Sequence, residues 1–219
     1  MALTKYNYNS FNVTPTASAG LGFNSDADGL AIATSSAMNL IKTITLASAA
    51  ASISFINGAS DVVLDGTYDT YLFKFTNLHP QTAGEGIGYN FTTDGTNFNV
   101  SKQTSAWRSF QNENGSGGVL DYQDAKDLAN GTGDQPITWD CNGNNDASTS
   151  GELFLFSPAS TTFVKHFIHQ SNGMHENPAC FTNFSAGYCN TTSAVTGAIF
   201  KYTSGNIDAG TIKMYGISK

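Results

Sequence analysis

Three of the four histidines, His166, His169 and His175, fall within ten residues of one another. Imidazole is a common metal ligand and proton carrier, so this spacing could indicate a metal or acid–base site. However, successive side chains of an extended strand point to opposite faces. His166 and His169 would then lie on different sides of a strand and could not share one ion. We interpret them as structural histidines and predict no metal ligand among them.

Two loops carry oxygen-rich side chains at alternating positions. Asn24, Asp26 and Asp28 precede a glycine as in the first half of a calcium loop, but Ser35 stands where the final glutamate is required. The second loop holds Asp140, Asn142, Asn144 and Asp146. Such side chains more often bond the backbone two residues further on, in Asx turns. We therefore predict turns at both places, with no bound metal or cofactor.

Both tryptophans lie in or next to polar stretches. Trp107 precedes an Asn-rich and Gly-rich segment, and Trp139 stands just before Asn142 and Asn144. An exposed aromatic ring beside amide side chains is how many β-sandwich lectins hold a sugar. Trp107, Trp139, Asn142 and Asn144 are therefore candidate glycan-binding residues. In the alternative interpretation, both tryptophans are half-buried core or interface residues.

No set of residues predicts a catalytic mechanism. Glycoside hydrolysis needs two carboxylates at a defined separation, and the sequence cannot bring any two glutamates together. A Gly-x-Ser-x-Gly nucleophile turn is missing from the sequence. The glycine-rich segment 84–88 lacks the helix that a nucleotide loop requires. We assign no catalytic residue and expect that the protein is not an enzyme.

Composition restricts the partners and the compartment. Only 12% of the 219 residues are charged and the net charge is −7, which argues against nucleic acid because phosphate contacts need clustered Lys and Arg. No apolar run of about 18 residues is present to cross a membrane. The first residues lack an apolar signal-peptide core, so we expect synthesis in a cytosol without secretory export.

The three cysteines, Cys141, Cys180 and Cys189, cannot form a closed disulfide framework. Cys180 and Cys189 could pair with each other or remain free thiols. A reducing cytosol favours free thiols.

The clearest structural signal is the strand predicted at 68–80. Tyr71, Phe73 and Phe75 would share one face, as the two-residue period of a strand requires. Residues 209–217 have the same pattern, and we predict that the two segments are central strands of one sandwich. Further strands are predicted at 40–46, 52–56, 87–92 with a hairpin partner at 98–102, 105–111, 152–156, 161–170, 184–188 and 198–203.

Residues 122–130 are the best helix candidate, because Asp121 can cap the segment and Gly131 can end it. The polar segment 132–149 is predicted to be a long loop with a functional or interface role. The predicted fold is all-β: an antiparallel β-sandwich or jelly roll with an extended N-terminal arm and at most one short helix. Residues 1–36 would form the arm and residues 37–219 the sandwich.

Several blocks of the sequence resemble structural proteins of marine tailed phages, cyanophages among them. The blocks are TYDTYLFKF (67–75) with LHP (78–80), STTFVKHFI (160–168), AGY (186–188), NTTSA (190–194) and SGNIDAGTIKMYG (204–216). They are spread over about residues 40–217 and are similar to a scaffold rather than to a binding or catalytic site.

The resemblance implies a non-enzymatic virion protein, assembled in the host cytoplasm and displayed on the particle. It would be either a head decoration (cement) protein or a short tail fibre or tip protein, anchored by the N-terminal arm. Its expected partners are other capsid or tail proteins and further copies of itself, as a homotrimer. The alternatives are a lectin-like receptor-binding protein for host glycans and a polysaccharide depolymerase that uses loop carboxylates.

Overall fold

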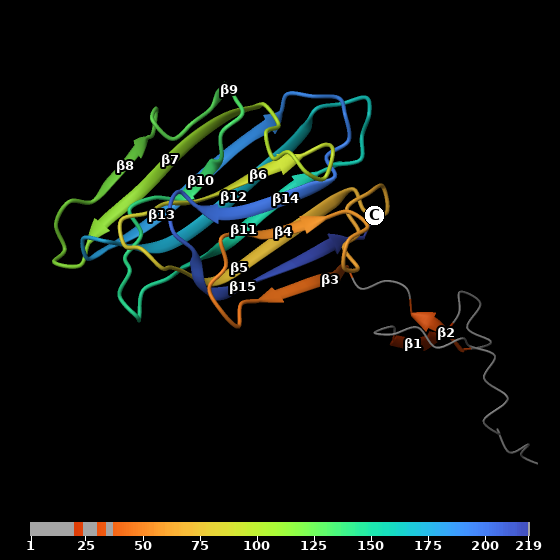
Figure 1. Cartoon of the computed structure of the whole chain (residues 1–219), viewed down its shortest axis with the longest axis horizontal. Helices are drawn as coiled ribbons and strands as arrows, with labels where there is room; N and C mark the ends of the chain where they lie inside the picture. Colours follow the sequence, from red (N-terminus) through yellow and green to blue (C-terminus); the bar gives the residue numbers. More distant parts are fainter. Residues whose placement is uncertain (1–19, 24–29, 34–36, 219) are drawn as a thin grey trace, which may run out of the picture.

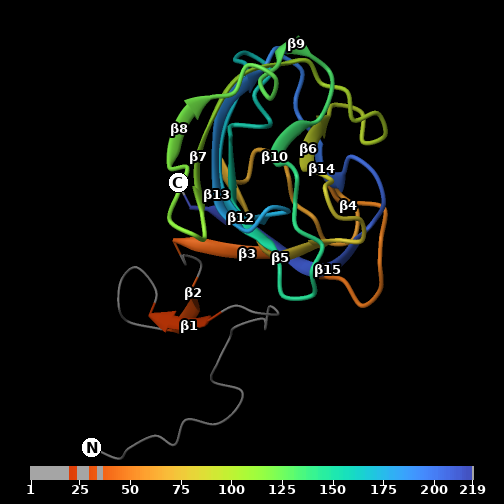
Figure 2. The same ribbon diagram turned by 90° about the vertical axis from the view of Figure 1, so that its left-hand side faces the viewer.

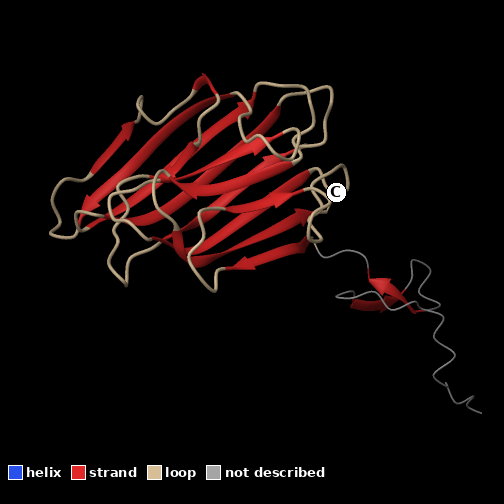
Figure 3. Ribbon diagram, viewed as in Figure 1, coloured by secondary structure: helices blue, strands red, loops and turns tan. Residues whose placement is uncertain are grey.

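The computed structural model describes residues 20–23, 30–33 and 37–218. Over these residues the chain forms strands and turns and no helix (Figure 3). β1 (Gly20–Phe23) and β2 (Leu30–Ala33) pair only with each other. The other strands form two antiparallel sheets that pack as a sandwich, which confirms the predicted fold class. The arm boundary at residue 36 stays a prediction, and the calcium-like segment 24–29 lies outside the described residues.

The two sheets differ in size (Figure 1). The larger has, in spatial order, β3 (Met38–Thr45), β15 (Ile207–Ile217), β5 (Thr70–Pro80), β11 (Thr149–Phe156), β12 (Lys165–His175), β13 (Ala179–Cys189), β7 (Lys102–Asn112) and β8 (Val119–Tyr122), with β9 (Ala129–Gly131) also on β7. The smaller has β10 (Gln135–Thr138), β6 (Ile87–Thr92), β14 (Gly197–Tyr202) and β4 (Ile53–Ile56). Figure 2 shows the larger sheet bending around the smaller one.

The two strands predicted as central are neighbours in the larger sheet. β5 and β15 pair antiparallel, with Phe73 opposite Met214 and Phe75 opposite Ile212. Phe73, Phe75 and Tyr71 are at most 1% exposed and face the smaller sheet across the core. The alternating aromatic pattern therefore does mark a core face, as the sequence indicates.

Aromatic rings join the sheets at the centre of the core. Phe200, on β14 of the smaller sheet, lies 5.6 Å from Phe73 and 6.4 Å from Phe75, measured between ring centroids. Phe55 on β4 approaches Phe73 at 5.4 Å with its ring tilted by 67°. Such edge-to-face contacts suit the ring quadrupoles and add to the burial of apolar area.

The helix predicted at residues 122–130 is wrong. β8 ends at Tyr122, a turn follows, and β9 begins at Ala129. The backbone groups of this segment bond to β7: the amide of Gln123 donates to the Ala106 carbonyl, and the Leu128 carbonyl accepts from the Thr104 amide. β7 has 11 residues and would otherwise leave that edge without partners, so inter-strand bonds replace the local helical ones.

Three further predictions need correction. Residues 98–102 are not the hairpin partner of β6, because β10 and β14 flank that strand. The strand predicted from 161 begins only at Lys165, and Phe163 lies in the preceding turn with 72% of its surface exposed. The predicted loop 132–149 contains β10, which pairs with β6. In each case the outcome depends on which strand pairs with the segment, and a local sequence pattern does not reveal that partner.

Candidate functional site

The outer face of the larger sheet carries a row of apolar side chains. Cross-strand pairing aligns one such side chain from each of six neighbouring strands, on the face opposite the core. We call this set the apolar row, and its members are Leu40, Tyr215, Leu72, Phe154, Ile168 and Ala186. Leu40 is 56% exposed and Ile168 is 50% exposed. Leu72, in the middle of the row, is only 4% exposed, so the exposed apolar surface lies mainly towards the two ends of the row. Exposed apolar surface on a sheet is a mark of an interaction site.

A second cluster, the outer aromatic patch, lies on the same face near the β8 edge. It consists of Trp107, Phe184, Tyr122 and Leu120. Trp107 stands opposite Phe184 on β13 and opposite Tyr122 on β8. The Trp107 and Phe184 rings stack with centroids 5.7 Å apart and planes 11° from parallel. Leu120 is 75% exposed, so the patch offers flat apolar rings and an aliphatic side chain to solvent.

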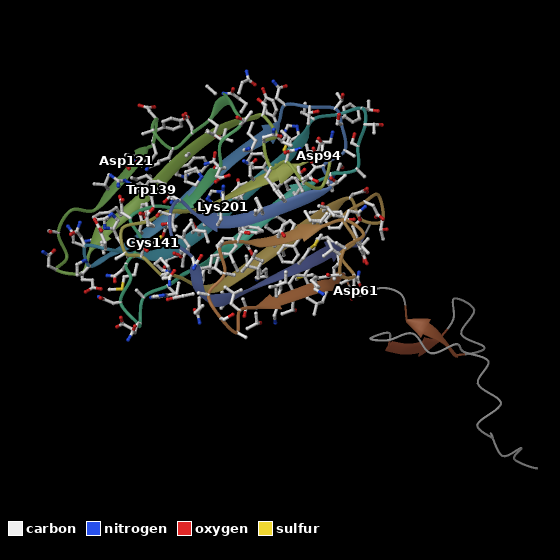
Figure 4. All side chains as sticks on the ribbon, viewed as in Figure 1. Asp61, Asp94, Asp121, Trp139, Cys141 and Lys201 are labelled. Atoms are coloured by element: carbon white, nitrogen blue, oxygen red, sulfur yellow. The ribbon has the colours of Figure 1, made fainter. Side chains whose placement is uncertain are left out.

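Trp139 lies elsewhere, in the wall of a pocket of about 160 Å³ that residues of β6, β10 and β14 help to line. Its ring is only 7% exposed and packs edge-on against Phe181, with centroids 4.7 Å apart. The Lys126 ammonium lies 5.1 Å from the indole centroid, a cation–π contact. Figure 4 labels Trp139 and Lys201, and both line this pocket. Lys201 Nζ forms an ion pair with Asp134 at 3.2 Å.

Asn142 is an internal structural residue. It is 5% exposed, its Nδ2 donates to the His175 carbonyl at 3.3 Å, and its Oδ1 accepts from the Asn144 amide at 2.8 Å. The last contact is the predicted Asx turn. The Asn144 carbonyl lies 3.0 Å from Nε2 of His79, so this loop is tied to β5.

The four candidate glycan residues are therefore not gathered in one place. Phe181 and Phe184 are separated by three positions on β13 and face opposite sides. Trp139 packs on the former and Trp107 on the latter. Trp107 is thus on the outer face and Trp139 on the core side. Glycan binding by either tryptophan stays a prediction.

The histidines also separate as their spacing predicts. His169 is 1% exposed on the core side, 3.3 Å from the Tyr89 hydroxyl, whereas His166 is on the outer face. His175 Nε2 lies 3.6 Å from an Asp140 oxygen. Across the described part of the chain, no group of three or more His, Cys, Asp or Glu residues is arranged to hold a metal ion. In the same residues, no helix is long and apolar enough to cross a membrane.

Sequence reasoning missed a row of buried ionisable groups that crosses three strands. Lys165, Cys189 and Lys102 are direct neighbours on β12, β13 and β7, and all three are 0% exposed. Lys102 Nζ donates to Asn90 Oδ1 at 2.6 Å and to the Val100 carbonyl at 2.7 Å. Burial lowers the pKa of Lys102 to about 8. The one signal was a lysine in each of two strands, β12 and β7, at an alternating, otherwise core-facing position.

Thiol reactivity gives a direct check of the cysteine environments. Cys180 is exposed and Cys141 and Cys189 are buried, all three as free thiols. Burial raises the pKa of Cys141 to about 11 and that of Cys189 to about 12. Because the thiolate is the reactive form, we expect a disulfide reagent at mildly alkaline pH to modify one thiol in the folded protein and three in denaturant. Cys180→Ser should abolish the reaction of the folded protein; fast modification of that variant would contradict the burial of the other two.

The two outer-face clusters can bind apolar or aromatic surfaces, and the pocket beside Trp139 can accept a small polar group. The row of buried ionisable groups holds the Lys102 amine away from solvent. Family models, curated proteins and solved structures give no match to this chain.

Proposed function

We propose that the chain is a non-enzymatic structural protein on the surface of a phage particle, as a head decoration (cement) protein or a short tail fibre or tip protein. The observation that carries the proposal is the apolar row on the outer face of the larger sheet. A structural protein of this kind works through contacts with other subunits, and those contacts need such a surface. The blocks that resemble marine phage structural proteins support the same assignment.

We assign the apolar row to the contact between copies of this chain, in a homotrimer. No member of the row is charged, and on one side of it the next row holds Lys74 and Glu152, which pair at 3.7 Å. Because the chain has a net charge of −7, copies repel one another least where charge is absent. A centre depleted of charged side chains is the usual arrangement of subunit interfaces. Residues 1–36 then anchor the assembly on other capsid or tail proteins.

The outer aromatic patch favours one second candidate, a lectin-like protein that binds host glycans. Trp107 is 37% exposed and stacks on Phe184, which gives a flat ring surface of the type on which sugars pack. The amide side chains expected beside such a ring, Asn142 and Asn144, lie elsewhere. A glycan array with the wild-type protein and Trp107→Ala tests this candidate separately from assembly.

The self-association proposal predicts a change of mass in solution. The wild-type chain should be trimeric by native mass spectrometry and light scattering. Placing a carboxylate in the row with Ile168→Asp should give monomers, because a buried, unpaired charge is costly at an interface. Phe163→Asp is the matched control: this side chain is 72% exposed in a turn outside the row, so its variant should stay trimeric. A monomeric wild-type protein, or a trimeric Ile168→Asp variant with native circular dichroism, would remove the row from the interface.

Localisation on particles tests the wider function. Gold-labelled antibodies or cryo-electron microscopy should find the protein on the head or the tail of virions. Many copies on the head favour decoration, and a few copies at the tail favour a fibre or tip. A chain without residues 1–36 should fold and associate but fail to enter particles. Normal incorporation of that chain would disprove the anchoring role, and absence of the protein from particles would disprove the function.

A further inference from the structure

Lys102 and Asn90 meet at the boundary between the two sheets. Lys102 begins β7 in the larger sheet, and Asn90 lies on β6 in the smaller one. Lys102 is 0% exposed and Asn90 is 2% exposed. The lysine Nζ lies 2.6 Å from Asn90 Oδ1. Because a carbonyl bond is about 1.23 Å long, Nζ is within about 3.8 Å of the Asn90 carboxamide carbon, close to the distance at which nucleophiles attack.

The orientation of the Asn90 amide is fixed by its four partners. Oδ1 accepts from two donors, the Lys102 amine and the Phe91 backbone amide at 2.9 Å. Nδ2 donates to two acceptors, the Thr132 carbonyl and Asp134 Oδ1, both at 3.0 Å. Reversing the amide would place like groups against each other at every contact. The carbonyl oxygen therefore faces the amine, and the amide nitrogen faces the carboxylate.

Each neighbour of Asn90 has a role in amide exchange. A lysine amine is a nucleophile when it is neutral, and burial favours the neutral form, since it lowers the pKa of Lys102 to about 8. The Phe91 N–H can stabilise negative charge that develops on Oδ1. The Asp134 carboxylate, beside the nitrogen that must leave, can carry a proton. It also lines the pocket next to Trp139, which gives ammonia a way out.

We propose that Lys102 and Asn90 form an intramolecular isopeptide bond that joins the two sheets. The neutral Nζ attacks Cγ of Asn90, and the carbonyl electron pair moves to Oδ1, where the Phe91 N–H holds it. Both nitrogens are then bonded to one carbon, so Asp134 can take a proton from Nζ and give it to Nδ2. The Cγ–Nδ2 bond breaks, the carbonyl forms again, and one ammonia leaves. An amine and a carboxamide give a substituted amide and ammonia, with no oxidant or other reactant.

Mass spectrometry of the purified full chain tests the bond. The intact mass should be lower than the sequence mass by one ammonia. Trypsin should not cut after Lys102, because its amine is acylated, and should release residues 75–108 as one peptide lacking one ammonia. Asn–Gly sequences can also lose ammonia by forming a succinimide, but none lies within 75–108. Two ordinary peptides, 75–102 and 103–108, would overturn the proposal whatever any variant does.

Variants separate the reaction from mere proximity. Lys102→Met and Asn90→Ala should each have the mass calculated from the variant sequence, with no loss of ammonia, since each lacks one reactant. Asp134→Asn keeps both reactants but cannot carry the proton, and it should remain uncrosslinked and be cut after Lys102. Lys165→Met is the matched control: Lys165 is also buried beside Cys189 but bonds the Thr191 carbonyl rather than an amide side chain. It should keep the crosslink. Complete crosslinking in Asp134→Asn would overturn the role of Asp134.

Discussion

Replacing Phe200 with alanine is expected to lower the free energy of unfolding by about 3–5 kcal/mol. Phe200 is 0% exposed and holds the two sheets together at the centre of the core. Its ring centroid lies within 6.4 Å of four other rings, those of Phe55, Phe73, Phe75 and Tyr89. Removing it loses the transfer energy of the ring and leaves a cavity that strands from both sheets cannot both move to fill.

Urea unfolding followed by tryptophan fluorescence measures this effect. Phe163→Ala is the control, because it removes the same side chain from a turn where the ring is 72% exposed. That variant should shift the free energy of unfolding by no more than about 0.5 kcal/mol. Similar losses in the two variants would mean that Phe200 is not at the centre of the core.

Acid is expected to destabilise the protein through His169. Burial lowers the pKa of this histidine from 6.5 to about 3. In the unfolded chain the imidazole takes up its proton near its ordinary pKa, so below that pH the unfolded state binds more protons than the folded state. Stability from this group is therefore complete above pH 6.5 and is lost as the pH falls from 6.5 towards 3. The loss is on the order of 4 kcal/mol.

His169→Gln tests the assignment, because glutamine cannot titrate. Its free energy of unfolding should fall much less than that of the wild type between neutral and acid pH, even if the variant is less stable at neutral pH. His166→Gln removes a solvent-facing imidazole from the neighbouring part of β12 and should keep the wild-type dependence. Parallel pH curves for wild type and His169→Gln would show that another group, such as a carboxylate, causes the acid sensitivity.

The sequence predicts the strands whose pattern is set by the core. Tyr71, Phe73 and Phe75 alternate with polar residues because one face of β5 is buried and the other is not, and the prediction there is correct. Prediction from alternation is less reliable for a strand that is covered on both faces. Every residue of β6 is buried, so the sequence pattern alone could not identify the strands that pair with it. Residues 122–130 have good helical caps, yet the open edge of β7 offers more backbone bonds than a short helix does.

The candidate sites could be predicted only in part. Asn142 does form the expected turn, because an Asx turn depends on residues close in sequence. Trp107 and Trp139 are on opposite sides of a sheet, which depends on register and not on composition. The apolar row needs six strands in order before it exists, and Lys102 meets Asn90 only after the sheets pack. Sites built from distant strands are therefore visible in the structure and not in local patterns.

The position of β15 also sets the order in which the molecule can be completed during synthesis. This strand inserts between β3 and β5, although β5 ends at Pro80 and β15 ends at Ile217. At translation rates of about 5–20 residues per second, β5 waits on the order of ten seconds for this neighbour. During that time the edge of β5 that pairs with β15 stays without its backbone partner. A nascent chain stalled before residue 207 should therefore bind chaperones and be cut readily by proteases, and release of the last strand should end both.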